Sequence, residues 1–362
     1  MARVVLEHLS RKFGDVAALS DVDLTIADGE FLSLLGPSGC GKTTTLRLLA
    51  GFLSPDDGRI VVDGRVLSAR GAVVPPEERG MAMIFQSYAV WPHKTVFENV
   101  AFGLKLRRRP RAEIKDRVGR MLELVRLGEF AARYPGEMSG GQQQRIALAR
   151  ALVVEPNILL FDEPLSNLDA SLREEMRFEI RRLHQEMRIT SIYVTHDQSE
   201  AMVTSDRIAV MNQGRVEQIG TPEEIYEHPR TQFVASFIGR TNCLTAVVAD
   251  RRSVRCNGLS LIVAPNGGIP GAGLTVALSI RPQDIRLADD GGPAPEAGSD
   301  NILEGRVLRH AYLGEARDYL VGVAGTDLIL RVVTSTAQVF RPDDSVRLTI
   351  AVDACRVIPQ EP

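Results

Sequence analysis

Short apolar segments alternate with stretches of helical periodicity over the first two thirds of the chain. Apolar segments at 30–36, 157–164 and 190–196 are followed by helical stretches at 42–51, 169–187 and 197–205. This alternation is typical of a parallel sheet whose strands are joined by crossover helices. The sequence therefore predicts an α/β fold for this part of the chain.

The pattern changes between residues 86 and 157, where only helical periodicity is seen. Helical stretches at 96–106, 112–127 and 140–153 follow the apolar segment 81–86. A run of helices between two strands of one sheet is best explained as an insertion. We expect a helical subdomain that covers about residues 88–155.

Beyond residue 237 the pattern becomes β-rich. Apolar segments lie at 274–282, 306–314, 327–334 and 346–358, and segments rich in Gly, Pro and Asp lie at 266–273 and 289–300. The Gly/Pro/Asp segments predict loops, and short strands at this spacing favour a small barrel. We therefore expect two domains, residues 1–237 with the α/β fold and residues 238–362 with an all-β, OB-like barrel.

Composition limits the possible functions only loosely. The chain has 362 residues, 44% of them hydrophobic and 25% charged, with a net charge of −3, which is typical of a globular protein with little overall attraction to nucleic acid. Charges at Arg3 and Glu7 leave no room for the apolar core of a signal peptide, so we expect a cytoplasmic protein. A membrane role would need a separate partner, because no run of 18 apolar residues occurs.

The four cysteines form no CxxC pair, which argues against a zinc site or a disulfide framework.

The stretch GPSGCGKTT follows an apolar strand and opens a helix. It fits the pattern GxxxxGK[ST] of a phosphate-binding loop, in which backbone N–H groups and a helix N-terminus surround phosphate oxygens. Its residues are Gly36, Pro37, Ser38, Gly39, Cys40, Gly41, Lys42, Thr43 and Thr44. Lys42 would neutralise the β- and γ-phosphates of ATP, and Thr43 would offer its hydroxyl to Mg²⁺.

Polar residues follow three further apolar strands. Asp162 and Glu163 end the segment NILLFDEP, so that Asp162 would hold Mg²⁺ and Glu163 would polarise the attacking water. His196 and Gln86 end two other strands and could contact the γ-phosphate and the metal with its water. Taken alone, an Asp-Glu pair is more often a helix cap, and a lone histidine is usually incidental. The upstream phosphate loop makes the catalytic interpretation the better one.

A second glycine-rich stretch, MSGGQQQR, precedes the helix predicted at 140–153. Ser139, Gly140, Gly141 and Gln142 would form another helix N-terminus with exposed N–H groups that attract an anion. In isolation, a serine N-cap with glycines in the turn is the simpler explanation. One nucleotide needs only one phosphate cradle, so the second one requires a reason.

These motifs together resemble the ATP-binding subunit of an ATP-binding cassette (ABC) transporter. The phosphate loop, Gln86, the signature MSGGQ at 138–142, the segment 158–163, the loop at 166–169 and His196 occur in the order typical of that family. The resemblance implies that two copies pair head to tail around two MgATP, with Ser139 and Gly141 touching the nucleotide of the partner. It also implies that Ser166 and Asp169 lie at this interface and that Phe13 stacks on the adenine. Met138 and Asn167 are mild departures, where leucine and alanine are more common.

The β-rich tail, with its SIRPQDIRL segment, is similar to the regulatory TOBE domain of ABC importers for sugars, polyamines, sulfate or ferric iron. This resemblance implies integral membrane permease subunits as partners, a solute-binding protein as an indirect partner, and a location on the cytoplasmic face of the membrane. An alternative is a soluble ABC ATPase that acts on nucleic acid or ribosomes. Such proteins usually have long coiled coils or two cassettes, and we see neither, so we expect no nucleic-acid partner.

Three other features have open interpretations. The segment 87–100, with Trp91, would receive a permease helix according to the resemblance, although Trp91 could equally be a core residue. The basic run 105–111 is best explained as a solvated helix end. Backbone N–H groups around Cys40 could favour its thiolate form.

Overall fold

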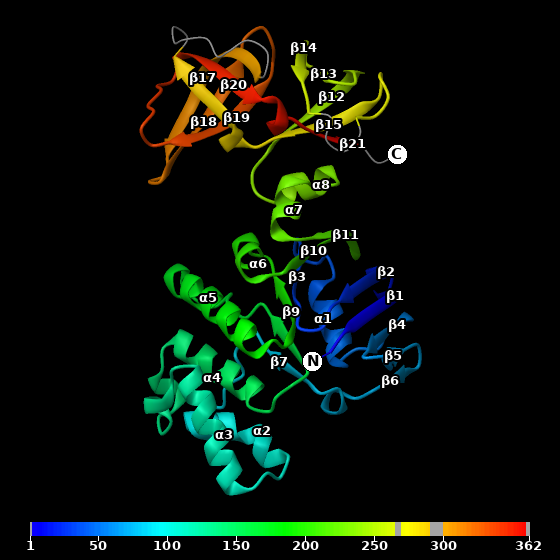
Figure 1. Ribbon diagram of the computed structural model, residues 1–362, viewed down its shortest axis with the longest axis vertical. Helices are drawn as coiled ribbons and strands as arrows, with labels where there is room; N and C mark the ends of the chain where they lie inside the picture. Colours follow the sequence, from blue (N-terminus) through cyan, green and yellow to red (C-terminus); the bar gives the residue numbers. More distant parts are fainter. Residues whose placement is uncertain (1, 265–268, 290–299, 360–362) are drawn as a thin grey trace. The chain divides into compact units, whose positions relative to one another are not determined.

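The computed structural model describes residues 2–264, 269–289 and 300–359. The chain divides into two compact units, Met1–Ile225 and Tyr226–Pro362. Of the two loops expected in the tail, residues 266–268 and 290–299 lie outside the described residues. Each unit is described separately below (Figure 1).

A mixed sheet forms the centre of the first unit, with the strand order β11-β10-β3-β9-β8-β7. Its strands are β3 (Phe31–Leu35), β7 (Met81–Ile84), β8 (Ile158–Asp162), β9 (Thr190–Thr195), β10 (Arg207–Asn212) and β11 (Arg215–Gly220). All neighbouring pairs are parallel except β10 with β11. The carboxyl ends of β3, β7, β8 and β9 therefore meet at one edge, where ligands bind in open α/β sheets.

Helices cover both faces of this sheet. The α-helices in the described residues are α1 (Lys42–Ala50), α2 (Val96–Leu106), α3 (Arg111–Leu124), α4 (Gly140–Leu152), α5 (Ala170–Met187), α6 (Gln198–Thr204), α7 (Pro222–Glu227) and α8 (Gln232–Phe237), of which α8 belongs to the second unit. Leu34, Leu160 and Val194 pack with α1 on one face. Phe31, Phe161 and Tyr193 pack with α4 and α5 on the other face. This arrangement follows from the strands, because successive side chains point to opposite faces.

A second sheet in this unit is antiparallel, with the order β2-β1-β4-β5-β6. Its strands are β1 (Val4–Phe13), β2 (Val16–Ile26), β4 (Asp57–Val62), β5 (Arg65–Ala69) and β6 (Ala72–Val73). The hydrophobic pattern did not indicate this sheet. Leu6 and Leu9 are both buried although they are three residues apart, since the register shifts between them. A bulge of this kind interrupts the alternation from which strands are recognised.

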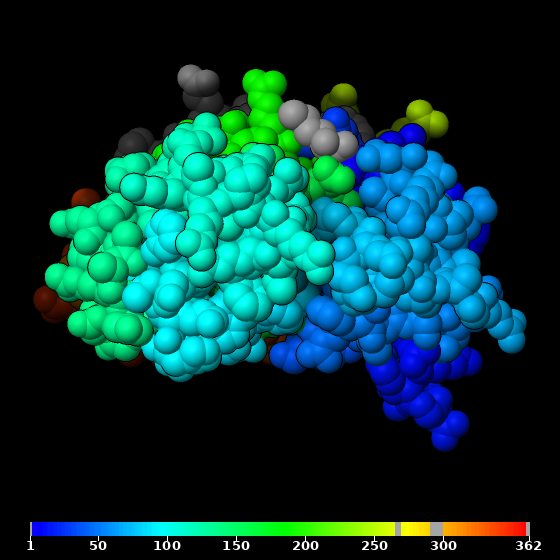
Figure 2. All heavy atoms as spheres, turned by 90° about the horizontal axis from the view of Figure 1, so that it is seen from below, coloured from blue at the N-terminus to red at the C-terminus, as the bar shows by residue number. Residues whose placement is uncertain are grey.

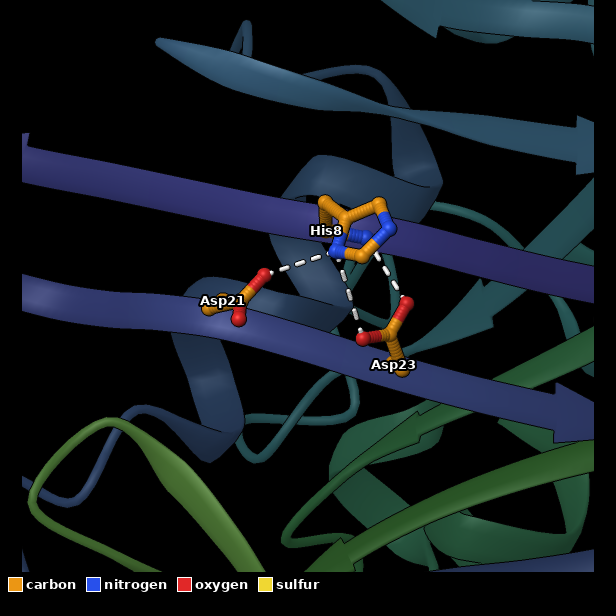
Figure 3. A group of neighbouring side chains, drawn as sticks. All are labelled: His8, Asp21 and Asp23. Atoms are coloured by element: carbon orange, nitrogen blue, oxygen red, sulfur yellow. Dashed lines mark hydrogen bonds and ion pairs between the residues drawn. The ribbon is translucent and has the colours of Figure 1, made fainter.

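The bulged strands bring together an exposed histidine and two exposed carboxylates (Figure 3). His8 on β1 lies 2.8 Å from Asp21 and 3.5 Å from Asp23 of β2, measured from its Nδ1. The hydrogen bond that the His8 ring donates to Asp21 Oδ1 raises the pKa of His8. Among the described residues, His8, Asp21 and Asp23 are close enough to one another to share a metal ion. Ion pairing between the histidine and the two carboxylates is sufficient to explain this geometry. We assign no ligand to it.

Helices α2, α3 and α4 form a region without strands that lies in the sequence between β7 and β8. Thr95 caps α2 in a capping box with Glu98, and Pro110 precedes the first residue of α3, where its missing N–H costs nothing. Figure 2 shows these helices, in cyan and green, on one side of a face of the molecule, and the strands β4 to β6, in blue, on the other side. The sequence predicted helices here.

The described residues of the second unit form two antiparallel sheets, with the orders β14-β13-β12-β15-β21 and β16-β20-β17-β18-β19. The strands are β12 (Asn242–Asp250), β13 (Ser253–Cys256), β14 (Leu259–Ile262), β15 (Thr275–Ile280), β16 (Ile285–Asp289), β17 (Asp300–Tyr312), β18 (Ala316–Val323), β19 (Ile329–Ser335), β20 (Ser345–Ala351) and β21 (Arg356–Pro359). In the second sheet the edge strands β16 and β19 lie close to each other. The sheet therefore curls toward a barrel, as expected for an OB-like fold (Figure 1).

Arg281 is the largest fully buried side chain of the second unit. Its guanidinium donates to the carbonyls of Tyr226, Ala235 and Ile238, and lies 4.2 Å above the ring of Tyr226. Burial lowers the pKa of Arg281. The arginine thus satisfies carbonyls at the ends of α7 and α8 and ties these short helices to β15.

No helix in the described ranges is both long and apolar enough to span a bilayer.

Candidate nucleotide site

The loop that follows β3 has a conformation that only glycine permits at two positions. A Cβ on Gly36 would lie 2.3 Å from the carbonyl oxygen of Met211, and one on Gly41 would lie 2.6 Å from that of Ala18. Gly41 also has a φ of 108° and is the N-cap of α1, without any side-chain hydrogen bond to the helix end. The first N–H groups of α1 therefore have no side-chain partner at the cap and are suited to an anion.

Lys42 is 5% exposed and turns back onto the loop. Its Nζ donates to the carbonyls of Gly36 and Pro37 at 2.7 and 2.9 Å. It also lies 3.8 Å from the sulfur of Cys40. Burial raises the pKa of Cys40, with Lys42 opposing this effect, so our expectation of a favoured thiolate was wrong. The loop therefore places the Lys42 amine beside a thiol whose ionised form is disfavoured by burial.

Thr43 and Asp162 meet at the ends of α1 and β8. Their Oγ1 and Oδ1 atoms are 3.4 Å apart. Burial raises the pKa of Asp162. A hydroxyl and a carboxylate are the oxygen ligands that Mg²⁺ prefers, so this pair fits the ion beside a bound triphosphate.

Glu163 and His196 are brought together from β8 and β9. His196 Nδ1 is 3.2 Å from Glu163 Oε2. Glu163 has a φ of 46°, in the left-handed region, and its N–H donates to the carbonyl of Val194 at 3.0 Å. Such a backbone conformation costs about 1–2 kcal/mol and is common at functional sites.

Gln86 follows β7 at the same sheet edge and is exposed. Its carbonyl accepts a hydrogen bond from Asn167 Nδ2 at 2.9 Å, so the unusual Asn167 has a partner in the structure. The next residues, Tyr88 and Ala89, have positive φ values of 59° and 48°. Arg150 of α4 donates to both of their carbonyls, at 2.8 and 2.6 Å, and holds this strained segment in place.

The signature residues form the start of α4. Ser139 Oγ accepts from the N–H of Gln142 at 3.3 Å, and Gln142 Oε1 accepts from the N–H of Ser139 at 2.9 Å. Ser139 and Gly140 are exposed, whereas Gly141 is buried, and a Cβ on Gly141 would lie 2.6 Å from Leu172. This helix end is on the opposite face of the sheet from α1 and its phosphate loop.

The loop between β8 and α5 contains Ser166 and Asp169. Ser166 Oγ donates to the carbonyl of Glu163 at 3.0 Å. Asp169 is the N-cap of α5 and accepts from the N–H of Leu172 at 3.0 Å. Phe13, at the end of β1, is 47% exposed, with the guanidinium of Arg11 5.1 Å from its ring centroid.

A phosphate loop, an acidic strand end and a histidine at one edge of a parallel sheet define the class of P-loop nucleotide hydrolases. The ABC transporter family model matches residues 19–166, and the TOBE domain model matches residues 278–358. The chain is 47% identical to "Spermidine/putrescine import ATP-binding protein PotA" of Rubrobacter xylanophilus, over 98% of this chain and 93% of the relative. It is 44% identical to "Spermidine/putrescine import ATP-binding protein PotA 2" of Pseudomonas aeruginosa, over 98% of both chains.

A solved structure of cbiO1 from Clostridium perfringens, described as part of the ABC transporter complex cbiONQ, has a similar fold. The TM-score is 0.57 at 29% identity, over 61% of this chain and 89% of that one. The chain therefore belongs to the ABC transporter ATP-binding proteins that carry a C-terminal TOBE domain. It is an ATPase whose activity is coupled to transport.

Proposed function

We propose that the protein is the ATP-hydrolysing motor of a polyamine importer. Two copies close around two MgATP, and this closure drives uptake through separate membrane permease subunits. The proposal for the solute rests on the relatives in Rubrobacter xylanophilus and Pseudomonas aeruginosa, whose names specify spermidine and putrescine import.

The observation that carries the dimer proposal is the placement of two helix N-termini on opposite faces of one sheet. The phosphate loop opens α1 on one face, and Ser139 opens α4 on the other. Both N-termini attract anions. A head-to-tail pair of chains would bring the second N-terminus of one copy to the phosphate loop of the other, so each nucleotide would be enclosed by two chains.

Within one chain, Lys42 and the loop N–H groups would bind the β- and γ-phosphates. Thr43 and Asp162 would hold Mg²⁺ together with Gln86, and the ion would neutralise phosphate charge. The adenine would stack on Phe13, which is exposed enough to receive it.

Glu163 would act as the general base for the attacking water, and His196, 3.2 Å away, would donate to the γ-phosphate. The partner copy would supply Ser139 and Gly141, with Gly140 and Gln142 shaping the turn. Ser166 and Asp169 would lie at the same interface. Positioning and charge stabilisation account for most of the catalysis of phosphoryl transfer.

Aromatic residues near Gln86 would contact the permease. Phe52 and Phe85 are 52% and 36% exposed with ring centroids 6.5 Å apart, and Trp91 is half-buried against Phe102 and Arg150. Exposed aromatics that neighbour a strained loop are suited to anchor a partner helix. The permease would place the protein at the cytoplasmic face of the membrane, and a solute-binding protein would deliver the cargo from the other side.

Mixed dimers test the shared site. Lys42→Ala and Ser139→Arg copies should each be inactive alone, and mixing them should restore turnover, because the mixed dimer contains one site built from intact halves. The Glu163→Gln variant should bind ATP and form an ATP-dependent dimer by gel filtration without hydrolysis. If mixing restores no activity while a monomer hydrolyses ATP normally, the shared site is wrong.

The solute is tested with the complete transporter in proteoliposomes, assembled from this protein, its permease subunits and its solute-binding protein. Spermidine or putrescine should stimulate ATP hydrolysis, and a sugar or sulfate should not. Stimulation by sulfate or a sugar alone would contradict the polyamine proposal and leave the ATPase proposal intact.

A further inference from the structure

A small polar cavity lies directly behind Glu163 and His196. It has a volume of about 40 Å³, enough for roughly two or three water molecules. Its walls come from separate segments: the loop after β8, the loop after β9, and one residue each of α5 and α6, namely Arg173 and Glu200. Neither of these two residues was indicated by the sequence motifs.

Glu200 fixes the backbone around His196. This carboxylate is 3% exposed and accepts from Tyr193 Oη at 2.9 Å and from Thr195 Oγ1 at 2.7 Å. Thr195 Oγ1 in turn accepts from the N–H of Asp197 at 2.9 Å. These bonds involve the residues on both sides of His196, so the position of the imidazole depends on Glu200.

Arg173 joins this network to the loop between β8 and α5. Its Nη2 donates to the carbonyl of Leu168 at 3.0 Å, one residue before Asp169. Its Nη1 lies 3.6 Å from Asp197, which also pairs with Arg177, and its Nε lies 4.0 Å from Glu200 Oε1. The Nε is buried and has no direct hydrogen-bond partner in the described part of the chain. A separation of 4.0 Å beside a polar cavity suits a bridging water.

We propose that Arg173 and Glu200 are positioning residues that couple the loop at Asp169 to His196. When a partner chain docks against Asp169 and its neighbours, Leu168 moves with them, and Arg173 transmits the change through Glu200 and Asp197 to the backbone of His196. Hydrolysis at one site is thus made conditional on a correctly seated interface. This inference rests on the proposed roles of Glu163, His196 and Asp169.

Arg181 provides a matched control on the same helix. It also donates to one carbonyl, that of Thr204 at 3.0 Å, and to one carboxylate, that of Asp206 at 2.7 Å, and it lines no part of the cavity. The side chains of Arg173 and Arg181 are 29% and 26% exposed. Arg173→Met and Arg181→Met should therefore lower the melting temperature by similar amounts.

The test compares steady-state hydrolysis by these variants of the full chain in its transporter complex. Arg173→Met should lower kcat about tenfold and leave KM for ATP within about twofold, the sign of an interaction that acts on the chemical step. Arg181→Met should leave kcat unchanged. Glu200→Gln keeps the acceptor for Thr195 and Tyr193 but turns an amide toward Arg173, and should match Arg173→Met. The double variant should be no worse than either single one, because coupled residues are not additive.

Two results would overturn the inference. One is a kcat for Arg173→Met and Glu200→Gln equal to that of Arg181→Met, and the other is a double variant whose losses multiply. The Glu163→Gln variant serves as a reference that distinguishes an error in the proposed coupling from an error in the proposed catalytic site. If that reference is inactive while Arg173→Met is fully active, only the coupling is wrong, whereas normal hydrolysis by Glu163→Gln removes the site and the inference with it.

Discussion

The N-termini of α1 and α4 are both glycine-rich, but their backbone N–H groups are treated differently. Gly41 leaves the start of α1 without a side-chain cap, and its first turn has no acidic residue. Ser139 and Gln142 cap α4 reciprocally in a capping box. The first end is suited to bind an anion, and the N–H groups of the second end have partners in its own side chains.

Under the proposed shared site, this difference would let one chain hold its own nucleotide at α1 and meet the nucleotide of a partner at α4. An uncapped end gains its missing hydrogen bonds from the phosphates at once. A capped end must exchange a bond that it already has, and the Ser139 cap, at 3.3 Å, is at the long end of the hydrogen-bond range. In the proposed dimer, the start of α4 would be stable alone and would exchange this bond when a partner brings its nucleotide.

The largest effect is expected from Gly36→Ala, which distorts the phosphate loop that leads into α1. The new Cβ would meet the carbonyl of Met211, which belongs to β10 and cannot move aside. We expect ATP affinity by calorimetry and turnover to fall more than about a hundredfold, since small misplacements at a phosphate site are this costly. Gly64→Ala is the control, because it has a φ of 79° but no neighbour within 4 Å, and should cost only strain. Near-normal ATP affinity in Gly36→Ala would contradict the cradle geometry.

A smaller effect is expected from Gly141→Ala at the α4 end. The new Cβ would press on Leu172, a side chain that can turn aside at a cost of about 1–3 kcal/mol. Turnover should fall about tenfold, while ATP affinity of the single chain stays unchanged because this end does not serve its own nucleotide. Adding Leu172→Ala should restore the melting temperature. A loss of ATP affinity like that of Gly36→Ala would show that the start of α4, like the start of α1, serves the nucleotide of its own chain.

Ser139→Ala should have a still smaller effect. Losing the cap costs about 1 kcal/mol of stability, measured by urea unfolding. Thr95→Ala removes the equivalent cap from α2 and should cost the same. Only Ser139→Ala should also lower turnover, by several-fold, because only this hydroxyl is proposed to meet a phosphate. Equal turnover in Ser139→Ala and Thr95→Ala would show that Ser139 acts only as a helix cap and does not contact a phosphate.

The smallest expected effect is a shift in the pH dependence of alkylation at Cys40 in the phosphate loop. Because burial raises the pKa of this thiol, less thiolate is present at a given pH than for a free cysteine, and the rate of alkylation should keep rising at pH values where free cysteine has levelled off. MgATP should slow the reaction further and labelling should stop hydrolysis. Mass spectrometry of the labelled peptide follows both effects. A plateau below the pKa of free cysteine would show that the loop N–H groups outweigh burial.

The sequence predicted the strand-end residues well because chemistry and topology agree there. Parallel strands place their carboxyl ends at one edge, so Asp162, Glu163 and His196 were expected together, and the structure has Glu163 and His196 within 3.2 Å. The antiparallel sheet near the N-terminus was not predicted, since bulges at His8 and Asp21 break the period of two.

Arg173 and Glu200 could not be identified either. Arg173 lies in α5, a helix rich in charged residues, where an arginine is usually solvated, and Glu200 lies in the first turn of the short helix α6, where a glutamate is an ordinary helix-start residue. Their proposed role rests on the burial of Glu200 and on the contacts that Arg173 makes between loops distant in sequence, and neither feature is encoded in a local pattern. The phosphate loop led us to expect a favoured thiolate at Cys40, but the degree of burial, which decided the direction of the pKa shift, depends on the folded surroundings.

Arg150 gives α4 a mechanical role. The helix starts at the signature and, roughly 16 Å further along, holds the carbonyls of Tyr88 and Ala89, just behind Gln86. Because an α-helix is stiff along its axis, a displacement at one end of α4 is transmitted to the other end. Under the proposed function, a push from a permease on the segment that follows Gln86 would be transmitted along α4 to Ser139, and a phosphate that reached Ser139 would act on the permease through the same helix.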